Sequence, residues 1–334
     1  MLYTPFNFMC IIIMTMSSIM AMSSSNWMFM WAGMELNLLS FIPLIMLTNS
    51  NQETEAAIKY FLAQALGSSI MLMSSLSLWF SSSAPMNFMS SILLMSLILK
   101  IGMAPCHLWY PSVMTSISWM SCFILSTWQK LAPLMIITFV MTGTSTNILL
   151  FLGAMNALIG GAIGMNQVHL RTIMAYSSIT HMGWMISLAA MNKFIPTIIY
   201  FLLYSMLIAP IFLIFQKFSI STSAGMNKLM SKAPILQALI PIMLLSLGGL
   251  PPLTGFIPKW MTIEIMSQSN PYILLVLIMG AMMNLYFYLN ITFNMLLSPT
   301  LSPHPHLSFM HMPMNYWMVT SISLLLLTPV LMLI

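Results

Sequence analysis

The stretch ILLMSLILKIGMAPCHLWYPSVMTSISWMSCFILSTWQKLAPL, residues 92–134, decides the fold that we expect for this chain. It is almost wholly apolar, yet it contains two lysines, Lys100 and Lys130, and an interruption that includes Gly102 and Pro105. A bilayer tolerates a broken helix or a buried charge only where protein or a water-filled cavity surrounds it. An ammonium at the bilayer centre costs roughly 2.5–3.5 kcal/mol on insertion scales, so we interpret such lysines as functional.

The composition of the whole chain indicates a polytopic membrane protein. Of 334 residues, 60% are hydrophobic and only 4% are charged, whereas charged residues make up about 25% of a soluble domain. A membrane-spanning helix needs roughly 20 apolar residues, so the chain has room for about eleven spans joined by short loops. We therefore expect one all-α integral membrane domain over residues 1–334. Its few basic residues are scattered and form no patch that would bind nucleic acid.

Polar and turn-forming segments divide the chain into eleven predicted spans. They are expected near residues 5–22, 27–48, 54–80, 88–110, 116–140, 147–165, 171–190, 195–216, 234–267, 271–297 and 316–334. The fourth and the ninth contain Gly/Pro interruptions and are predicted to be discontinuous helices. A Pro- and His-bearing loop, residues 298–315, separates the last two spans.

The loops indicate the orientation of the chain, because cytoplasmic-side loops of membrane proteins carry an excess of Lys and Arg. If the spans alternate, the side of the N-terminus carries Arg171, Lys217, Lys228 and Lys232, and the opposite side carries Lys193. The N-terminus is therefore predicted on the inner side. With an odd number of spans, the C-terminus is predicted on the outer side.

Each broken span brings a lysine close to its interruption, Lys100 in the first and Lys259 in the second. Paired discontinuous helices in corresponding parts of a chain are the best sequence indication of a transport site near the middle of the bilayer. Glycine and proline are also frequent in ordinary membrane helices, so either break alone is equally well explained as structural. A break beside a buried lysine, found twice, favours function.

Lys130 is predicted near the middle of the fifth span, with no break beside it. Burial disfavours the charged form of an amine, so a buried lysine can release a proton as well as take one up. The alternative is a lysine that a fixed partner keeps permanently charged. Glu35 is the only carboxylate well inside a predicted span and is the candidate partner. We favour a pair whose charge state switches and thereby gates proton release.

Three other titratable residues are weaker candidates for proton transfer. His181 lies mid-span and His107 lies in the first break, but a lone intramembrane histidine more often forms an interhelical hydrogen bond. Glu264 lies five residues after Lys259, toward the outer end of its span, where a carboxylate needs no special role. The chain has no C-x-x-C pair, P-loop or nucleotide-binding glycine motif, and its last-loop histidines lack metal-ligand spacing. Any cofactor or metal is therefore expected in other chains.

Six segments carry a resemblance to a known family: WAGMELNLLSFIPL, TEAAIKYF, LILKIGMAPCHLWYP, STWQKLAPL, LRTIMAYSSITHMGWM and SLGGLPPLTGFIPKW. They resemble the chain 2 family of NADH–ubiquinone oxidoreductase, in the short form that animals have. Members of this family are mitochondrially encoded membrane subunits of respiratory complex I. The resemblance covers about residues 1–297. It implies an antiporter-like fold with two inverted repeats in the mitochondrial inner membrane, the N-terminus in the matrix and the C-terminus in the intermembrane space. This chain has Cys106 where the family often has an aromatic residue, and Asn290 where many relatives have arginine.

The resemblance also implies roles for individual residues. Glu35 and Lys100 would form an interacting pair, Lys130 would be the central proton carrier, and Lys259 would lie on the exit side. FMN, iron–sulfur clusters and ubiquinone would be bound by partner subunits of the complex, and inner-membrane lipids such as cardiolipin would surround the chain.

Two other functions remain alternatives. A free-standing cation/proton antiporter would need acidic cation ligands near the breaks, and apart from Glu35 the predicted span interiors have none. A structural subunit that does not pump would keep the fold without a working proton path. The sequence predicts a proton-translocating membrane subunit of the NADH:ubiquinone oxidoreductase complex, coupled to quinone reduction elsewhere in that complex.

Overall fold

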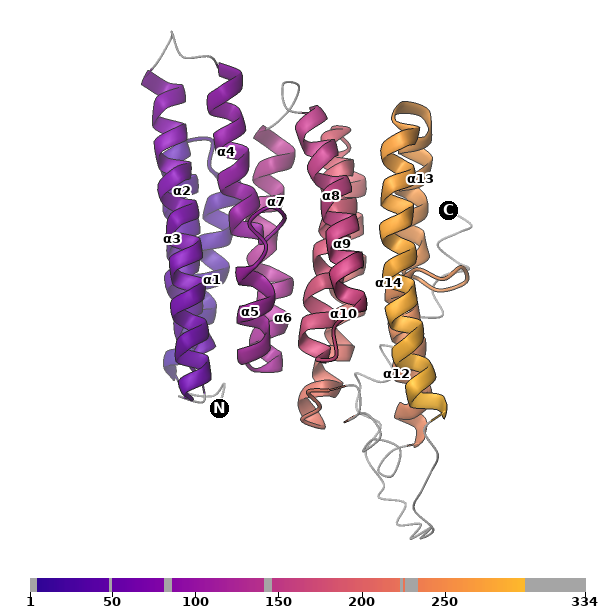
Figure 1. The fold of residues 1–334 in the computed structure, drawn as a ribbon. Helices are drawn as coiled ribbons and strands as arrows, with labels where there is room; N and C mark the ends of the chain where they lie inside the picture. The colour runs from indigo at the N-terminus through magenta and orange to yellow at the C-terminus, as the bar shows by residue number, and fades with distance from the viewer. Residues whose placement is uncertain are drawn as a thin grey trace. The chain divides into compact units, whose positions relative to one another are not determined.

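The computed structural model describes residues 5–47, 50–80, 86–140, 146–222, 225 and 234–297. The predicted last loop and last span, residues 298–334, lie outside the described residues. Figure 1 shows the described helices with their labels. The chain divides into two compact units. Unit 1 comprises Met1–Asn156 and Ile186–Phe194, and unit 2 comprises Ala157–Met185 and Ile195–Ile334.

The described residues are almost entirely α-helical, which confirms the predicted fold class. The helices are α1 (Pro5–Ser23), α2 (Trp27–Ile45), α3 (Asn51–Phe80), α4 (Met86–Ile101), α5 (Trp109–Ser116), α6 (Trp119–Ser126), α7 (Trp128–Val140), α8 (Thr146–Met165), α9 (Leu170–Ala190), α10 (Phe194–Lys217), α12 (Pro234–Gly248), α13 (Phe256–Ser269) and α14 (Pro271–Leu297). Among the described residues, 7 helical segments are long and apolar enough to cross a membrane. Each predicted span up to residue 297 overlaps one helix or a pair of helices, but α5 extends to Ser116, beyond the predicted end of the fourth span at residue 110 and up to the predicted start of the fifth.

Both predicted helix breaks are present. The fourth span consists of α4 and α5, and the ninth consists of α12 and α13. In each pair the two helices are joined by an unwound segment, residues 102–108 in the first and residues 249–255 in the second. Each of these crossings therefore exposes helix-terminal backbone groups inside the protein, and these groups need hydrogen-bond partners.

The fifth span differs from the prediction, because a one-residue interruption at Thr127 separates α6 from α7. The Thr127 hydroxyl donates to the carbonyl of Phe123 over 2.7 Å, as does its own backbone N–H over 3.1 Å. Such back-bonding by threonine bends helices. The following backbone bond, from Lys130 N–H to the Thr127 carbonyl at 3.2 Å, is of the tighter three-residue type. The prediction that no break lies beside Lys130 is therefore wrong.

Small residues let the helices of unit 2 approach closely. A Cβ atom on Gly161 of α8 would lie 3.0 Å from the carbonyl oxygen of Gly280 in α14. One on Gly280 would lie 2.5 Å from the carbonyl oxygen of Ala157. Membrane helices pack through such small residues because lipid provides no hydrophobic force that would drive helices together. The close approach of α8 and α14 accounts for Gly161 and Gly164, whereas a Cβ atom on Gly160 would lie 2.8 Å from the Tyr176 carbonyl oxygen of α9.

Candidate functional site

The helices α4 and α12 end in the same way. Each is followed by a glycine in the left-handed conformation, Gly102 with φ +80° and Gly249 with φ +81°. Glycine has no Cβ and adopts this conformation at no steric cost. Met103 N–H then bonds back to the Ile98 carbonyl over 3.2 Å, and an equivalent bond of 3.4 Å closes α12. These are Schellman motifs, which satisfy part of the free carbonyls of a helix C-terminus.

The two breaks also share a sequence pattern that our reading of the sequence did not use. A glycine is followed by a proline three residues later and by a second proline six residues after that, at residues 102–111 and again at residues 249–258. The lysines occupy different places in the pattern. Lys100 precedes the glycine of the first break, and Lys259 follows the second proline of the second. The same turn therefore occurs twice, with the lysine in the helix before the first break and in the helix after the second.

In the first break, Lys100 is 5% exposed and lies in the last turn of α4. Neutral side chains bind the carbonyls of that turn: Gln64 Nε2 donates to the Lys100 carbonyl over 2.9 Å, and Trp109 Nε1 donates to the Leu99 carbonyl over 3.1 Å. A Cβ atom on Gly67 of α3 would lie 2.9 Å from Cγ of Lys100. Helix α3 therefore packs closely against the lysine stem.

Asn156 of α8 holds the unwound segment of the first break. Its Oδ1 accepts a hydrogen bond of 2.7 Å from the Ala104 N–H, and its Nδ2 donates to the Leu152 carbonyl over 2.7 Å. Asn156 is 0% exposed. Our sequence reasoning missed this residue, although a polar side chain in the middle of an apolar span was a signal that could have identified it.

Replacing Asn156 with leucine should destabilise the protein, because the buried Ala104 N–H would lose its partner. An unsatisfied buried donor costs about 1–3 kcal/mol. Asn147→Leu, at an exposed position of the same helix, is the matched control. Thermal unfolding of the assembled complex should show a lower midpoint for Asn156→Leu only. Equal midpoints for the two variants would contradict the role of Asn156.

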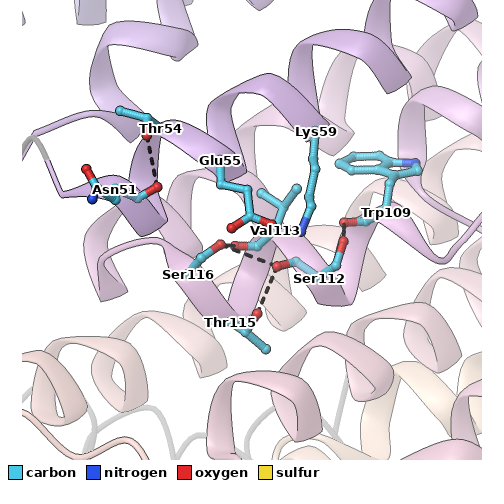
Figure 2. Close-up of polar contacts among 9 residues, drawn as sticks. All are labelled: Asn51, Thr54, Glu55, Lys59, Trp109, Ser112, Val113, Thr115 and Ser116. Atoms are coloured by element: carbon cyan, nitrogen blue, oxygen red, sulfur yellow. Dashed lines mark hydrogen bonds and ion pairs between the residues drawn. The ribbon is translucent and has the colours of Figure 1, made fainter.

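Glu35 lies half-buried on α2, close enough to Lys100 and to Tyr60 of α3 for electrostatic interaction. Within the described ranges, Glu35 and Lys100 form no direct ion pair, and Oε2 of Glu35 has no hydrogen-bond partner. The described residues do contain an ion pair elsewhere, between the exposed side chains of Glu55 and Lys59 in α3, with a distance of 2.5 Å (Figure 2). Glu35 thus lies near Lys100 without a direct ion pair to it.

Lys130 lies on α7 and is 2% exposed. Its Nζ lies 4.1 Å from the centroid of the Tyr110 ring, a distance at which a cation and an aromatic face attract each other. Tyr110 is fully buried in the first turn of α5, directly after the first break. The helices on the two sides of the first break therefore serve both lysines. The helix after the break places the Tyr110 ring against Lys130, and the helix before it places the stem of Lys100 against α3.

In the second break, Lys259 lies in the first turn of α13 and is 5% exposed. Its Nζ donates to the Gly248 carbonyl, the last of α12, over 2.6 Å. The C-terminus of a helix carries a partial negative charge, which stabilises a nearby cation. A Cβ atom on Gly249 would lie 2.8 Å from this same Nζ. The turn and the lysine therefore fit each other closely.

The weaker candidates lie in three different settings. His181 of α9 is buried, and its Nδ1 shares a hydrogen bond of 3.0 Å with the Tyr200 hydroxyl of α10. His107 is buried in the first break, and Glu264 is exposed on α13. Among the residues that the structure describes, no group of three or more His, Cys, Asp and Glu is placed to hold a metal ion.

The candidate residues divide between the two units. Unit 1 contains Glu35, Lys100, His107 and Lys130, and unit 2 contains His181, Lys259 and Glu264. Each unit therefore combines a broken helix with at least one buried lysine.

Comparison with known proteins identifies the family of the chain. The family described as "NADH:quinone oxidoreductase/Mrp antiporter, TM" matches residues 24–284. NADH-ubiquinone oxidoreductase chain 2 of Lumbricus terrestris is 56% identical over 289 residues, which cover 86% of this chain and 85% of the relative. The protein of the same name from Bos taurus is 38% identical over 329 residues, which cover 96% of this chain and 93% of that one.

Two solved structures share the fold. A chain of respiratory complex I from Thermus thermophilus superposes with a TM-score of 0.83 at 22% identity, covering 98% of this chain and 77% of that one. A chain of the Mrp complex from Dietzia sp. gives 0.73 at 18% identity, covering 85% of this chain and 59% of that one. At these identities the likeness concerns the fold, whereas the sequence matches decide the family. The chain belongs to the NADH–ubiquinone oxidoreductase chain 2 family.

Proposed function

We propose that this chain is a proton-translocating membrane subunit of mitochondrial NADH:ubiquinone oxidoreductase, without a redox centre of its own. The observation that carries the proposal is the burial of three lysines beside interrupted helices: Lys100, Lys130 and Lys259 are 5%, 2% and 5% exposed. Each costs roughly 2.5–3.5 kcal/mol on insertion scales, so a functional role explains the presence of all three better than a structural role does. Membership of a family that includes antiporters supports a transport role.

The charged groups suggest an order of events. Quinone reduction elsewhere in the complex changes the charge state of the Glu35–Lys100 pair. Because electrostatic interactions are strong in a medium of low dielectric constant, this change alters how readily Lys130 holds its proton. Lys130 Nζ then releases that proton toward the exit side, where Lys259 takes part in the next transfer.

The contact of Lys259 suits a residue that holds a proton for a limited time. A protonated Nζ forms a charge-assisted hydrogen bond to the Gly248 carbonyl and interacts favourably with the end of α12. Loss of the proton removes the charge and weakens both interactions. The lysine is therefore held in place while it carries the proton and is held less firmly afterwards.

The proposed setting is the mitochondrial inner membrane, with the N-terminus in the matrix and the C-terminus in the intermembrane space. The distribution of Lys and Arg over the predicted loops supports this orientation. FMN, iron–sulfur clusters and ubiquinone would be bound by partner subunits, and lipids such as cardiolipin would lie against the apolar faces of the helices.

Glu35→Gln tests the proposal, because it removes the carboxylate that interacts electrostatically with Lys100 and changes the shape of the side chain little. We expect the ratio of protons pumped to NADH oxidised to fall in the assembled complex. The matched control is Glu55→Gln, which removes an exposed carboxylate from the ion pair with Lys59 and should leave the ratio unchanged.

The same preparations distinguish the two alternative functions. Unchanged pumping after neutral replacement of Glu35 and of all three buried lysines would indicate a structural subunit. Sodium-dependent proton flux by the purified chain alone would indicate a free-standing antiporter. Either result would overturn the proposal.

A further inference from the structure

Three neutral polar side chains of unit 1 form a hydrogen-bonded triad that joins three helices. The hydroxyl of Tyr60 in α3 donates to Oε1 of Gln129 in α7 over 3.2 Å. The Nε2 of Gln129 donates in turn to Oδ1 of Asn37 in α2 over 3.0 Å. Tyr60 is 1% exposed and Asn37 is 4% exposed. Both polar groups of the Gln129 amide are therefore engaged, one with each neighbouring helix.

Each member of the triad is close, in sequence or in space, to a charged residue of the proposed proton path. Gln129 directly precedes Lys130, and Asn37 is two residues from Glu35 on the same helix. Tyr60 is close enough to Glu35 for an electrostatic interaction. The triad thus connects the helix of the carboxylate with the helix of the central lysine.

A series of aromatic rings leads from the same tyrosine to Lys130 by a second route. The Tyr60 ring centroid lies 5.9 Å from that of Trp109, which lies 5.8 Å from that of Tyr110. The Tyr110 ring contacts the Lys130 ammonium. Trp109 also donates to the Leu99 carbonyl in the last turn of α4. Tyr60 is therefore linked to Lys130 in two ways: through the side-chain amide of the preceding residue, Gln129, and through the rings of Trp109 and Tyr110.

The place of Gln129 in its helix explains why such an anchor is needed. Helix α7 begins at Trp128, directly after the interruption at Thr127, so Gln129 and Lys130 lie in a first turn with incomplete backbone bonding. Apolar side chains would fill this space without the cost of burying amides. The two side-chain bonds of Gln129 instead fix this turn to α2 and α3.

We propose that the Tyr60–Gln129–Asn37 triad is a positioning device that couples the charge state of Glu35 to the placement of the Lys130 ammonium. This inference rests on the proton path proposed above. A change of charge at Glu35 alters the forces on Tyr60 and on α2, and the triad passes the resulting movement to the first turn of α7. None of the three residues gives up or accepts the transported proton.

Gln129→Met and Tyr60→Phe test the triad in the assembled complex. Methionine keeps the length of glutamine and removes both bonds, and phenylalanine keeps the ring and removes one. We expect proton transfer through the subunit to slow about tenfold in Gln129→Met, as the loss of two neutral hydrogen bonds allows, and less in Tyr60→Phe. The double variant should be no worse than Gln129→Met alone, because both changes act through one contact.

The controls make the same chemical changes away from the triad. Gln52→Met replaces an exposed glutamine at the start of α3, and Tyr272→Phe replaces a tyrosine of α14 that is 83% exposed. Both should keep the normal ratio of protons pumped to NADH oxidised. The ratio, unlike the amount of complex, is not changed by a residue that only helps the chain to fold.

The outcomes separate the triad from the proton path itself. Lys130→Met is measured in the same series. If it lowers the ratio but Gln129→Met and Tyr60→Phe do not, the triad has no positioning role and the proton path stands. If Lys130→Met leaves the ratio normal, the proton path fails. Additive defects in the double variant would indicate two independent packing roles and would overturn the coupling. If Gln129→Met prevents assembly, Tyr60→Phe alone decides.

Discussion

Replacing Lys130 with methionine should slow proton transfer through this subunit by roughly 10²- to 10⁴-fold, the contribution typical of a positioned proton-transfer group. Methionine matches the length of the lysine stem, so the fully buried Tyr110 ring keeps an apolar neighbour. The amine that would carry the proton is lost. The ratio of protons taken up by vesicles to NADH oxidised in the same sample measures the effect in the assembled complex.

The control for this prediction is Lys59→Met, the same chemical change at an exposed position. The Lys59 side chain is 46% exposed and its ion pair with Glu55 lies at the surface of the chain, where such pairs contribute little to stability. We expect normal assembly and a normal proton-to-electron ratio. A normal ratio in Lys130→Met as well would show that Lys130 is not a carrier, whatever its burial.

The breaks and the buried lysines were predictable from the sequence because their signals are local. Gly102 and Gly249 stand in largely apolar spans, each followed three residues later by a proline, which lacks a backbone N–H and disfavours a continuous helix. A lysine in such a span has few alternatives to burial. The cost of placing a charged side chain in lipid can be recognised from the sequence alone, without knowledge of any contact. The structure places all three lysines in the interior of their units.

The side chains that hold these features were not predictable, because their partners are distant in sequence. Gln64 meets a carbonyl 36 residues away, Asn156 meets an N–H 52 residues away, and Gln129 meets an amide 92 residues away. The sequence shows that an amide lies inside a span but not which backbone group or side chain it faces. Only the folded chain decides that.

The interruption at Thr127 was missed for a different reason. Serine and threonine occur in ordinary membrane helices, where their hydroxyls bond to the preceding turn. Nothing in the sequence distinguishes Thr127 from the many hydroxyl residues whose helices stay continuous. Its consequence is functional under our proposal, because it frees the first turn of α7 to be positioned by Gln129.

Gly249→Ala should strongly damage the second break, although it adds only one methyl group. The residue has φ +81°, and a left-handed conformation costs a non-glycine residue about 1–2 kcal/mol. The new Cβ would lie 2.8 Å from both Cδ and Nζ of Lys259, so the lysine must move and lose its bond to the Gly248 carbonyl. A hydrogen bond to a charged group contributes about 1.5–3 kcal/mol. Both the thermal midpoint and the pumping ratio of the assembled complex should fall.

The neighbouring glycine provides the control that isolates this effect. A Cβ atom on Gly248 would lie no closer than 3.6 Å to Tyr288 and its other neighbours, an ordinary contact, so Gly248→Ala should be neutral or should stabilise α12 by up to about 1 kcal/mol. If both glycine variants behave alike, the turn does not constrain Lys259. If the turn does constrain Lys259, adding Lys259→Met to Gly249→Ala should restore part of the lost stability without restoring pumping. A methionine has no ammonium bound to the Gly248 carbonyl, so it can move away from the new methyl group, but it carries no proton.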